Sequence, residues 1–366
     1  MSDFLKGERP RLLALAHETL AHAVPTEFSF NGALGTAIFA CALARLDESF
    51  NAWPWIEQAV AYLNAHGAEP GLVGLSGLGA VIASSFPDEE EVLTSFDESL
   101  IGHLPRLVAG DWHFGHSGIA VYAALRSQTP TGQALAQALA EGMRAAAIPL
   151  AGGVVYALKS EPAGTINMGM AHGLAGALTG LTILFQLGFV ELETLIRGSL
   201  TTLWRFERTE PNRFAWFYRS ADDTNPILSS RGSWCWGDPG VLRAAYLAAS
   251  ACGDAPSRGR ALAAARRGAA VAIATSWPKA DEGGLSFCCG CSIAAHIYGK
   301  YWRETQEVIF RRAQEHILVA CLDHLSSVPI FGLSHGRMGV LLALLYGASD
   351  EDPSWDIIRG LSLPVA

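Results

Sequence analysis

Charged residues are scarce in this chain. Asp, Glu, Lys and Arg together make up 17% of its 366 residues, whereas hydrophobic residues make up 50%, so either most of each helix is buried or the protein lies in a membrane. A membrane span is not expected, because the most apolar stretch, residues 168–190, contains His172 and Gln186 and lacks flanking basic residues. We interpret this stretch as a buried helix.

Other features are missing as well. There is no cluster of basic residues and the formal net charge is −9, which argues against a nucleic-acid partner. The first ten residues have no positively charged start followed by an apolar run, so a secretory signal is not expected and a cytoplasmic location is. The seven cysteines are an odd number, and five fall within residues 235–291. This clustering favours metal or thiol chemistry over a disulfide framework.

A glycine repeat is the main feature that the sequence does contain. The pattern Gly-x-x-Gly, or a close variant, recurs seven times at intervals of 41 to 64 residues, and each copy opens an apolar stretch. Self-similarity with a spacing of this size is typical of repeat architectures. The copies are Gly32/Gly35, Gly74/Gly77, Gly115/Gly118, Gly173/Gly176, Gly237/Gly240, Gly290/Ile293 and Gly336/Gly339.

A second set of helices is predicted between the copies. These segments have one polar face, and several begin at proline or acidic residues, as helix starts prefer. The glycine-led segments are apolar all round and should lie inside. The outer segments are residues 9–23, 57–66, 89–108, 131–147, 190–206, 258–276 and 307–325. Weak strand signals occur only at Gly153–Tyr156 and residues 214–218.

The pattern predicts an all-α fold, an α/α toroid (barrel) of seven helix hairpins with an inner and an outer ring of seven helices each. The first and last copies are as apolar as the middle ones, whereas an open solenoid needs polar capping repeats at its ends. On periodicity alone, an open α-solenoid is the alternative. We expect one domain over residues 1–366.

Sulfur atoms gather beside the glycines of two neighbouring copies. Cys235 and Cys288 each lie two residues before a motif glycine, so a toroid should bring them to the same mouth. With Cys289 they offer three thiolates, which favour zinc in a tetrahedral site with one position open. Burial as ordinary apolar cysteines is the alternative. Cys291 is a further candidate ligand, although it lies inside the expected helix. The cysteines out of register are expected to be packing residues: Cys41, Cys252 and Cys321.

Polar residues of other copies should face the same mouth. His172 comes directly before its motif glycine, the position that Cys289 occupies two copies later. A lone histidine on an apolar helix is more often a buried core residue, but this register favours a place at the site. Asp111 in the third copy and Arg231, four residues before Cys235, complete the set. These side chains suit a zinc-bound nucleophile with an acid/base group beside it.

Three motifs carry a specific resemblance. Gly-Met-Ala-His-Gly at 169–173, Ser-Trp-Cys-Trp-Gly-Asp-Pro-Gly at 233–240 and Cys-Cys-Gly at 288–290, together with seven glycine repeats, resemble the lanthionine synthetase C-like family, best known as lantibiotic cyclases. The resemblance extends over essentially the whole chain. It implies an α/α barrel with Zn²⁺ at its mouth, where a peptide cysteine thiolate attacks the β-carbon of dehydroalanine or dehydrobutyrine. The resulting enolate is then protonated at the α-carbon.

The resemblance also assigns roles to single residues. It makes His172 the acid/base group and Asp111 and Arg231 its active-site companions, and its zinc ligands correspond to Cys235, Cys288 and Cys289. Two departures stand out, because Cys289 replaces a more usual histidine and Trp236 replaces a usual tyrosine. A third thiolate adds negative charge, so we expect a more nucleophilic but less acidic site.

The implied partners follow from the same resemblance. They are a dehydrated precursor peptide as substrate, a separate dehydratase, since no kinase-like or lyase-like segment is present, and an exporter, with peripheral attachment to a membrane in a biosynthetic complex. Two other readings are open: a relative that adds glutathione to dehydrated residues, and a non-catalytic peptide-binding scaffold with a structural zinc. A terpene-cyclase-like toroid would need an aspartate cluster, whereas Asp222 and Asp223 fit a turn better.

Overall fold

The computed structural model describes residues 3–157, 165–207, 218–220, 232–279 and 283–364. Within these residues the fold is helical, with fourteen α-helices, four short 3₁₀ segments and two small antiparallel sheets. The 3₁₀ segments are η1 (Leu104–Arg106), η2 (Val190–Leu192), η4 (Leu325–Ser327) and η5 (Ser354–Arg359). The α-helices alternate between two kinds along the chain.

Each of the seven glycine repeats starts a helix. In every copy the first motif glycine is the residue directly before the helix, and the helix that follows is buried along most of its length. The predicted glycine-led inner helices are therefore confirmed, including the buried helix expected within residues 168–190. They are α2 (Ala33–Ala44), α4 (Leu75–Ser85), α6 (His116–Leu125), α8 (Leu174–Gln186), α10 (Asp238–Ala251), α12 (Cys291–Thr305) and α14 (Arg337–Gly347).

The other seven helices bury one face only. In the seventh helix of the chain, for example, Leu135, Leu139 and Met143 are buried, and the spacing of four places them on one side. All seven predicted outer segments are confirmed, with ends shifted by a few residues. They are α1 (Asp3–Ala21), α3 (Trp53–His66), α5 (Glu90–His103), α7 (Pro130–Ala145), α9 (Glu193–Arg205), α11 (Ala255–Ala274) and α13 (Val308–Asp323).

The two sheets are small. Strands β1 (Ala147–Leu150) and β2 (Gly153–Tyr156) form an antiparallel hairpin, which confirms the strand expected at β2. Strand β3 (Thr165–Asn167) pairs with β4 (Tyr218–Ser220). The second predicted strand, residues 214–218, touches β4 at its last residue only, and its other residues lie outside the described part of the chain.

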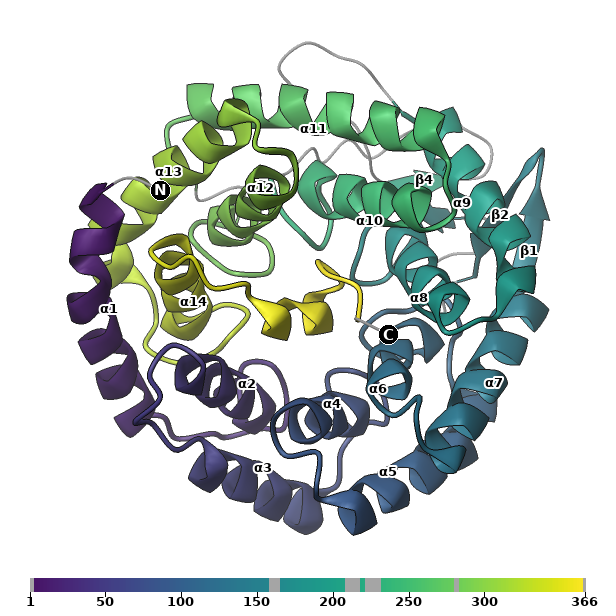
Figure 1. The fold of residues 1–366 in the computed structure, drawn as a ribbon, viewed down its shortest axis with the longest axis horizontal. Helices are drawn as coiled ribbons and strands as arrows, with labels where there is room; N and C mark the ends of the chain where they lie inside the picture. The colour runs from purple at the N-terminus through teal and green to yellow at the C-terminus, as the bar shows by residue number, and fades with distance from the viewer. Residues whose placement is uncertain (1–2, 158–164, 208–217, 221–231, 280–282, 365–366) are drawn as a thin grey trace. The chain divides into compact units, whose positions relative to one another are not determined.

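Two compact units are described separately. The first comprises Met1–Ala68, Arg231–Trp234 and Ala265–Trp355. In it α14 packs against α1, α2 and α12 (Figure 1). The N–H of Leu333, just before α14, donates to the carbonyl oxygen of Phe30 at 2.9 Å, and the Tyr346 hydroxyl donates to the carbonyl of Ala42 at 3.1 Å. The last repeat therefore contacts the first, as the predicted closure requires.

The second unit comprises Glu69–Ser230, Cys235–Ala264 and Asp356–Ala366. Helices α4, α6, α8 and α10 pack against one another in chain order, and α5, α7 and α9 each pack on the preceding inner helix (Figure 1). The single domain predicted over the whole chain stays a prediction. No helix in the described part of the chain is both long and apolar enough to cross a membrane.

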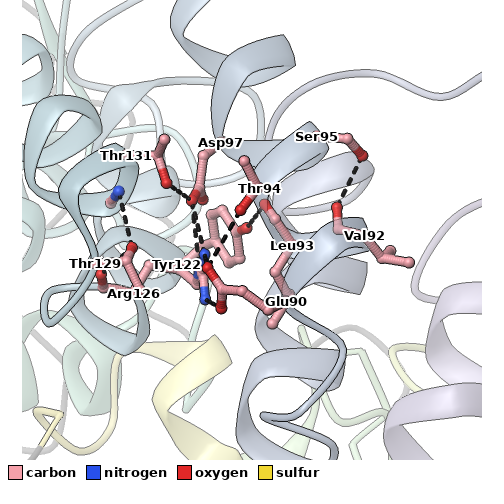
Figure 2. Close-up of polar contacts among 11 residues, drawn as sticks. Glu90, Val92, Leu93, Thr94, Ser95, Asp97, Tyr122, Arg126, Thr129 and Thr131 are labelled. Carbon is pink, nitrogen blue, oxygen red and sulfur yellow. Dashed lines mark hydrogen bonds and ion pairs between the residues drawn. The ribbon is translucent and has the colours of Figure 1, made fainter.

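A partly buried ion cluster joins α5, the end of α6 and α7 in this second unit (Figure 2). The Arg126 guanidinium is 3.1 Å from Asp97 and 2.6 Å from Glu90, and the Thr131 hydroxyl donates to Asp97 at 2.6 Å. The Tyr122 hydroxyl donates to the carbonyl of Leu93 at 2.9 Å, and burial raises its pKa. Because the Arg126 and Asp97 side chains are 4% and 0% exposed, this pair holds the helices together where water is excluded.

Candidate active site

Backbone hydrogen bonds join the loops that precede the inner helices. The same bond occurs in four places. The donor is the backbone N–H of the residue three positions before the first motif glycine of one repeat. The acceptor is the carbonyl of the residue two positions before the first motif glycine of another repeat. These bonds join Trp112 to Ala171 (3.2 Å), Met170 to Cys235 (3.0 Å), Trp234 to Cys288 (3.3 Å) and Leu333 to Phe30 (2.9 Å). The repeated register places equivalent positions of neighbouring repeats side by side, as the sequence predicts.

One of these contacts depends on a glycine. A Cβ atom at Gly169 would lie 2.3 Å from the carbonyl oxygen of Cys235, closer than any side chain tolerates. Only glycine at this position allows the loop of residues 168–172 to rest on the backbone of Cys235. The loop that carries His172 is thereby fixed beside the first predicted zinc ligand.

Three thiols are found at the third of these loop junctions, that of Trp234 and Cys288. The sulfurs of Cys235, Cys288 and Cys289 lie within 4.8 Å of one another. Cys235 is bonded covalently to Trp234, whose N–H donates to the carbonyl of Cys288, so the backbone itself holds the first two cysteines together. Sulfurs around a tetrahedral zinc stand about 3.8 Å apart, given Zn–S distances of about 2.3 Å. The donor set therefore fits zinc after a small inward movement.

The three thiols lie at the starts of two inner helices. Cys235 and Cys288 are buried, Cys289 is half-buried, and they lie just before the first residues of α10 and α12. Helix starts present N–H groups without helical partners and the positive end of the helix dipole. The half-buried Cys289 leaves the cluster accessible from its own side.

His172 and Asp111 form a hydrogen-bonded pair. The Nδ1 atom of His172 lies 2.8 Å from Oδ2 of Asp111, and the two side chains are 31% and 14% exposed. The other carboxylate oxygen, Oδ1, accepts the backbone N–H of Phe114 at 2.8 Å. Asp111 is thus held from two sides, and with Nδ1 engaged, Nε2 is the ring nitrogen of His172 left for chemistry.

Two residues that the sequence reasoning passed over surround His172. The ring of Phe114 stacks on the imidazole, with centroids 5.8 Å apart and planes 9° from parallel. The His113 ring meets it edge-on at 5.1 Å and 88°. Burial, with smaller effects of nearby Arg359 and His172, holds the pKa of His113 well below its usual value, so His113 stays neutral. The only sequence signal for these two was their place directly after Asp111 and Trp112.

The C-terminal segment was also missed. The Trp112 indole N–H donates to the carbonyl of Ile358 at 3.2 Å, and the Arg243 guanidinium donates to that of Leu361 at 2.8 Å. Gly360 has a φ of +65°, which disfavours other residues, and a Cβ atom there would lie 2.4 Å from the end of the Met170 side chain and 3.1 Å from the Trp112 ring. The segment therefore supports both loops of the His172–Asp111 pair. It lies outside the glycine repeats, although its run of apolar residues was a signal for burial.

The structure describes the other predicted cysteines but not Arg231. Cys291 is fully buried as the first residue of α12, which agrees with a packing role. All seven cysteines are free. Of those out of register, Cys41 and Cys321 are buried and Cys252 is half-buried. Arg231, the third predicted active-site residue, lies outside the described residues, so its role stays a prediction.

These features define an all-α repeat protein with a His–Asp pair in the loops before α6 and α8 and three thiols in the loops before α10 and α12. The family model for lanthionine synthetase C-like proteins matches residues 29–359, and the chain belongs to this family. It is also similar to the solved structure of nisin cyclase, with a TM-score of 0.75 over 98% of each chain at 17% sequence identity.

A second similar structure is a GH76 α-mannanase of Bacteroides thetaiotaomicron, with a TM-score of 0.50 over 83% of this chain and 97% of that chain at 8% identity. At these identities the likeness shows the fold alone. The similarity to nisin cyclase confirms the predicted all-α toroid of helix pairs. No protein among the curated sequences matches the chain.

Proposed function

We propose that this chain is a lanthionine-type cyclase, which adds a peptide cysteine thiol to the β-carbon of a dehydroalanine or dehydrobutyrine residue of the same peptide and closes a thioether ring. The observation that carries the proposal is the loop register, in which the loop of the His172–Asp111 pair is hydrogen-bonded to the backbone of Cys235, a member of the three-thiol group. Membership of the lanthionine synthetase C-like family and the likeness to a protein named as a cyclase support it.

We propose Zn²⁺ as the cofactor, with Cys235, Cys288 and Cys289 as ligands. Three soft thiolates suit this ion better than magnesium or calcium. When bound, zinc would act as a Lewis acid that keeps a substrate thiol in its thiolate form near neutral pH, where a free thiol with a pKa of about 8.5 is mostly protonated.

His172 is proposed as the group that moves the proton. Asp111 accepts the N–H at Nδ1 and fixes the tautomer whose Nε2 carries a lone pair, as a carboxylate does for histidine in acid/base catalysis. The thiol loses one proton, a C–S bond forms at the β-carbon while the C=C π bond breaks, and the α-carbon gains one proton. His172 Nε2 takes up and returns that proton, so no oxidant or further reactant is needed.

The substrate must reach the site already dehydrated. A reaction that removes water from serine or threonine residues therefore has to precede this one, and we propose a separate dehydratase for it. The exporter, the cytoplasmic location and the attachment to a membrane-bound complex also stay proposals.

A synthetic peptide with one dehydroalanine and one cysteine tests the function. Cyclisation leaves the mass unchanged but removes the free thiol, so alkylation followed by mass spectrometry measures it. We expect ring closure faster than the uncatalysed reaction, and its loss in His172→Asn. Adding glutathione distinguishes the second reading, since transfer to the peptide would raise its mass. A chain that binds zinc and peptide but accelerates neither reaction would be a scaffold, and the cyclase proposal would be wrong.

A further inference from the structure

Phe114 occupies a distinct position beside His172. It lies between Asp111 and the glycine that precedes α6, and its ring stacks nearly parallel on the His172 imidazole. The residue is nonetheless 46% exposed. A single exposed apolar side chain needs no explanation by itself. This one covers one face of the proposed acid/base group and presents the rest of its ring to solvent.

The backbone and the side chain of Phe114 make different contacts. The backbone N–H donates to Oδ1 of Asp111, and any residue other than proline offers that donor. The support of Asp111 therefore does not require an aromatic side chain. What the phenyl ring adds is an apolar surface next to the imidazole, and that contribution can be removed by substitution without removing the N–H.

The contacts around His172 indicate that the apolar surface of Phe114 lies close to the reacting atoms. Asp111 holds Nδ1, Phe114 covers one ring face, and His113 meets the ring edge-on. None of these contacts involves Nε2, and the α-carbon of the dehydrated residue has to come within about 3 to 3.5 Å of that atom for proton transfer. Neighbouring α-carbons in a peptide are about 3.8 Å apart, so the residues that flank the dehydrated one come within reach of the exposed phenyl ring.

We infer that Phe114 is a specificity-determining residue, which binds the apolar side chain of a residue flanking the dehydrated residue of the peptide. The inference rests on the proposed cyclase function. It names the substrate class more narrowly as peptides with an apolar neighbour at the dehydrated position. Burial of an aliphatic side chain against the ring removes apolar surface from water, which favours such peptides over those with a polar neighbour.

Two synthetic peptides that differ only in the residue next to dehydroalanine, leucine or serine, test the inference. We expect kcat/KM to favour the leucine peptide by about tenfold, the effect of burying most of a leucine side chain. Phe114→Ala should reduce this preference to about twofold or less, mainly by raising KM for the leucine peptide. Phe114→Leu should keep most of it, because leucine is also apolar. Phe331→Ala is the matched control, since Phe331 is 45% exposed in a different loop, and it should leave the preference unchanged.

A peptide contact of Phe114 can be tested separately from the cyclase function. Binding of unreactive peptides, with alanine in place of dehydroalanine, is measured by calorimetry on the same variants. If the wild type closes no ring but binds the leucine peptide more tightly through Phe114, the cyclase function is wrong and the contact stands. An equal loss for both peptides in Phe114→Ala, or an unchanged preference in turnover and binding, would show that the ring only supports His172 and would overturn the inference.

Discussion

Nδ1 of His172 lies 2.8 Å from Oδ2 of Asp111, although the two residues are 61 positions apart and belong to different repeats. The bond is possible because the loop before α6 donates from Trp112 to the carbonyl of Ala171. Side chains at matching places in adjacent loops thereby come within hydrogen-bonding distance. The pair therefore joins the loops that precede α6 and α8.

Removing the imidazole should abolish most of the enzyme-controlled ring closure. We expect His172→Asn to lower the cyclisation rate by about 100-fold or more, since a positioned acid/base group typically contributes that much. Asp111→Asn should act in the same direction but less, about tenfold or more, because it loosens the ring without removing it. Rates come from thiol alkylation, and metal content should not change in either variant. Full activity of His172→Asn would contradict the assignment.

Metal content tests the choice of thiols. We expect about one zinc per chain by elemental analysis, and Cys289→Ala should lose most of it because only two of the three thiols would remain. Cys289→His should retain the metal, since imidazole fits a tetrahedral site at about 2.0 to 2.1 Å, and should still cyclise at an altered rate. Cys291→Ser is the control, because Cys291 is fully buried as the first residue of α12. Loss of zinc in Cys291→Ser with retention in Cys289→Ala would mean that the wrong thiol was chosen.

The ion cluster of Figure 2 should contribute unequally to stability. Asp97→Ala leaves the buried Arg126 guanidinium without its buried carboxylate, so we expect a loss of about 3 to 5 kcal/mol in the free energy of unfolding. Glu90 also binds Arg126, but its side chain is 55% exposed, so Glu90→Ala should lower the free energy of unfolding much less than Asp97→Ala does. Urea denaturation measures both. Equal losses in the two variants would show that burial does not set the strength of these pairs.

Stability should fall with acidification through buried histidines. His116 is buried, its Nε2–H donates to the carbonyl of Leu104 at 3.0 Å, and burial lowers its pKa. In the unfolded chain His116 has a pKa of about 6.5, so below that pH it binds a proton, whereas in the folded chain it stays neutral to a lower pH. Protonation therefore favours the unfolded chain, and the stability present above a pH of about 6.5 is lost as the pH falls. The largest slope for one such group is about 1.4 kcal/mol per pH unit.

A glutamine variant isolates this contribution. In His116→Gln the amide nitrogen can still donate to Leu104, but the residue no longer titrates. We expect its free energy of unfolding to fall less steeply than that of the wild type between pH 7 and pH 5, as measured by urea denaturation at several pH values. The pKa of His113 is lowered by burial in the same way, but His113 is present in both the wild type and His116→Gln, so its contribution to the slope is the same in both. If the free energy of unfolding fell equally steeply with pH in both proteins, His116 would not contribute to the loss of stability in acid.

Much of the fold could be predicted because its signals are local. A glycine at the start of an apolar stretch marks a helix start wherever it occurs, and all seven such marks begin helices in the structure. The register of the cysteines follows from the same marks, since repeats of one kind align at their starts. The strands β1 and β3 could not be predicted, because segments of three or four residues carry too little periodicity.

The sequence by itself determined the helix pairs, the grouping of Cys235, Cys288 and Cys289, and the end of the inner helices at which these cysteines lie. The tertiary structure alone decided that His172 pairs with Asp111, that Phe114 stacks on the imidazole, and that the segment around Gly360 supports their loops. The reason is physical. A helix start depends on a few consecutive residues, whereas side-chain contacts between distant loops depend on rotamers and packing that no local pattern specifies.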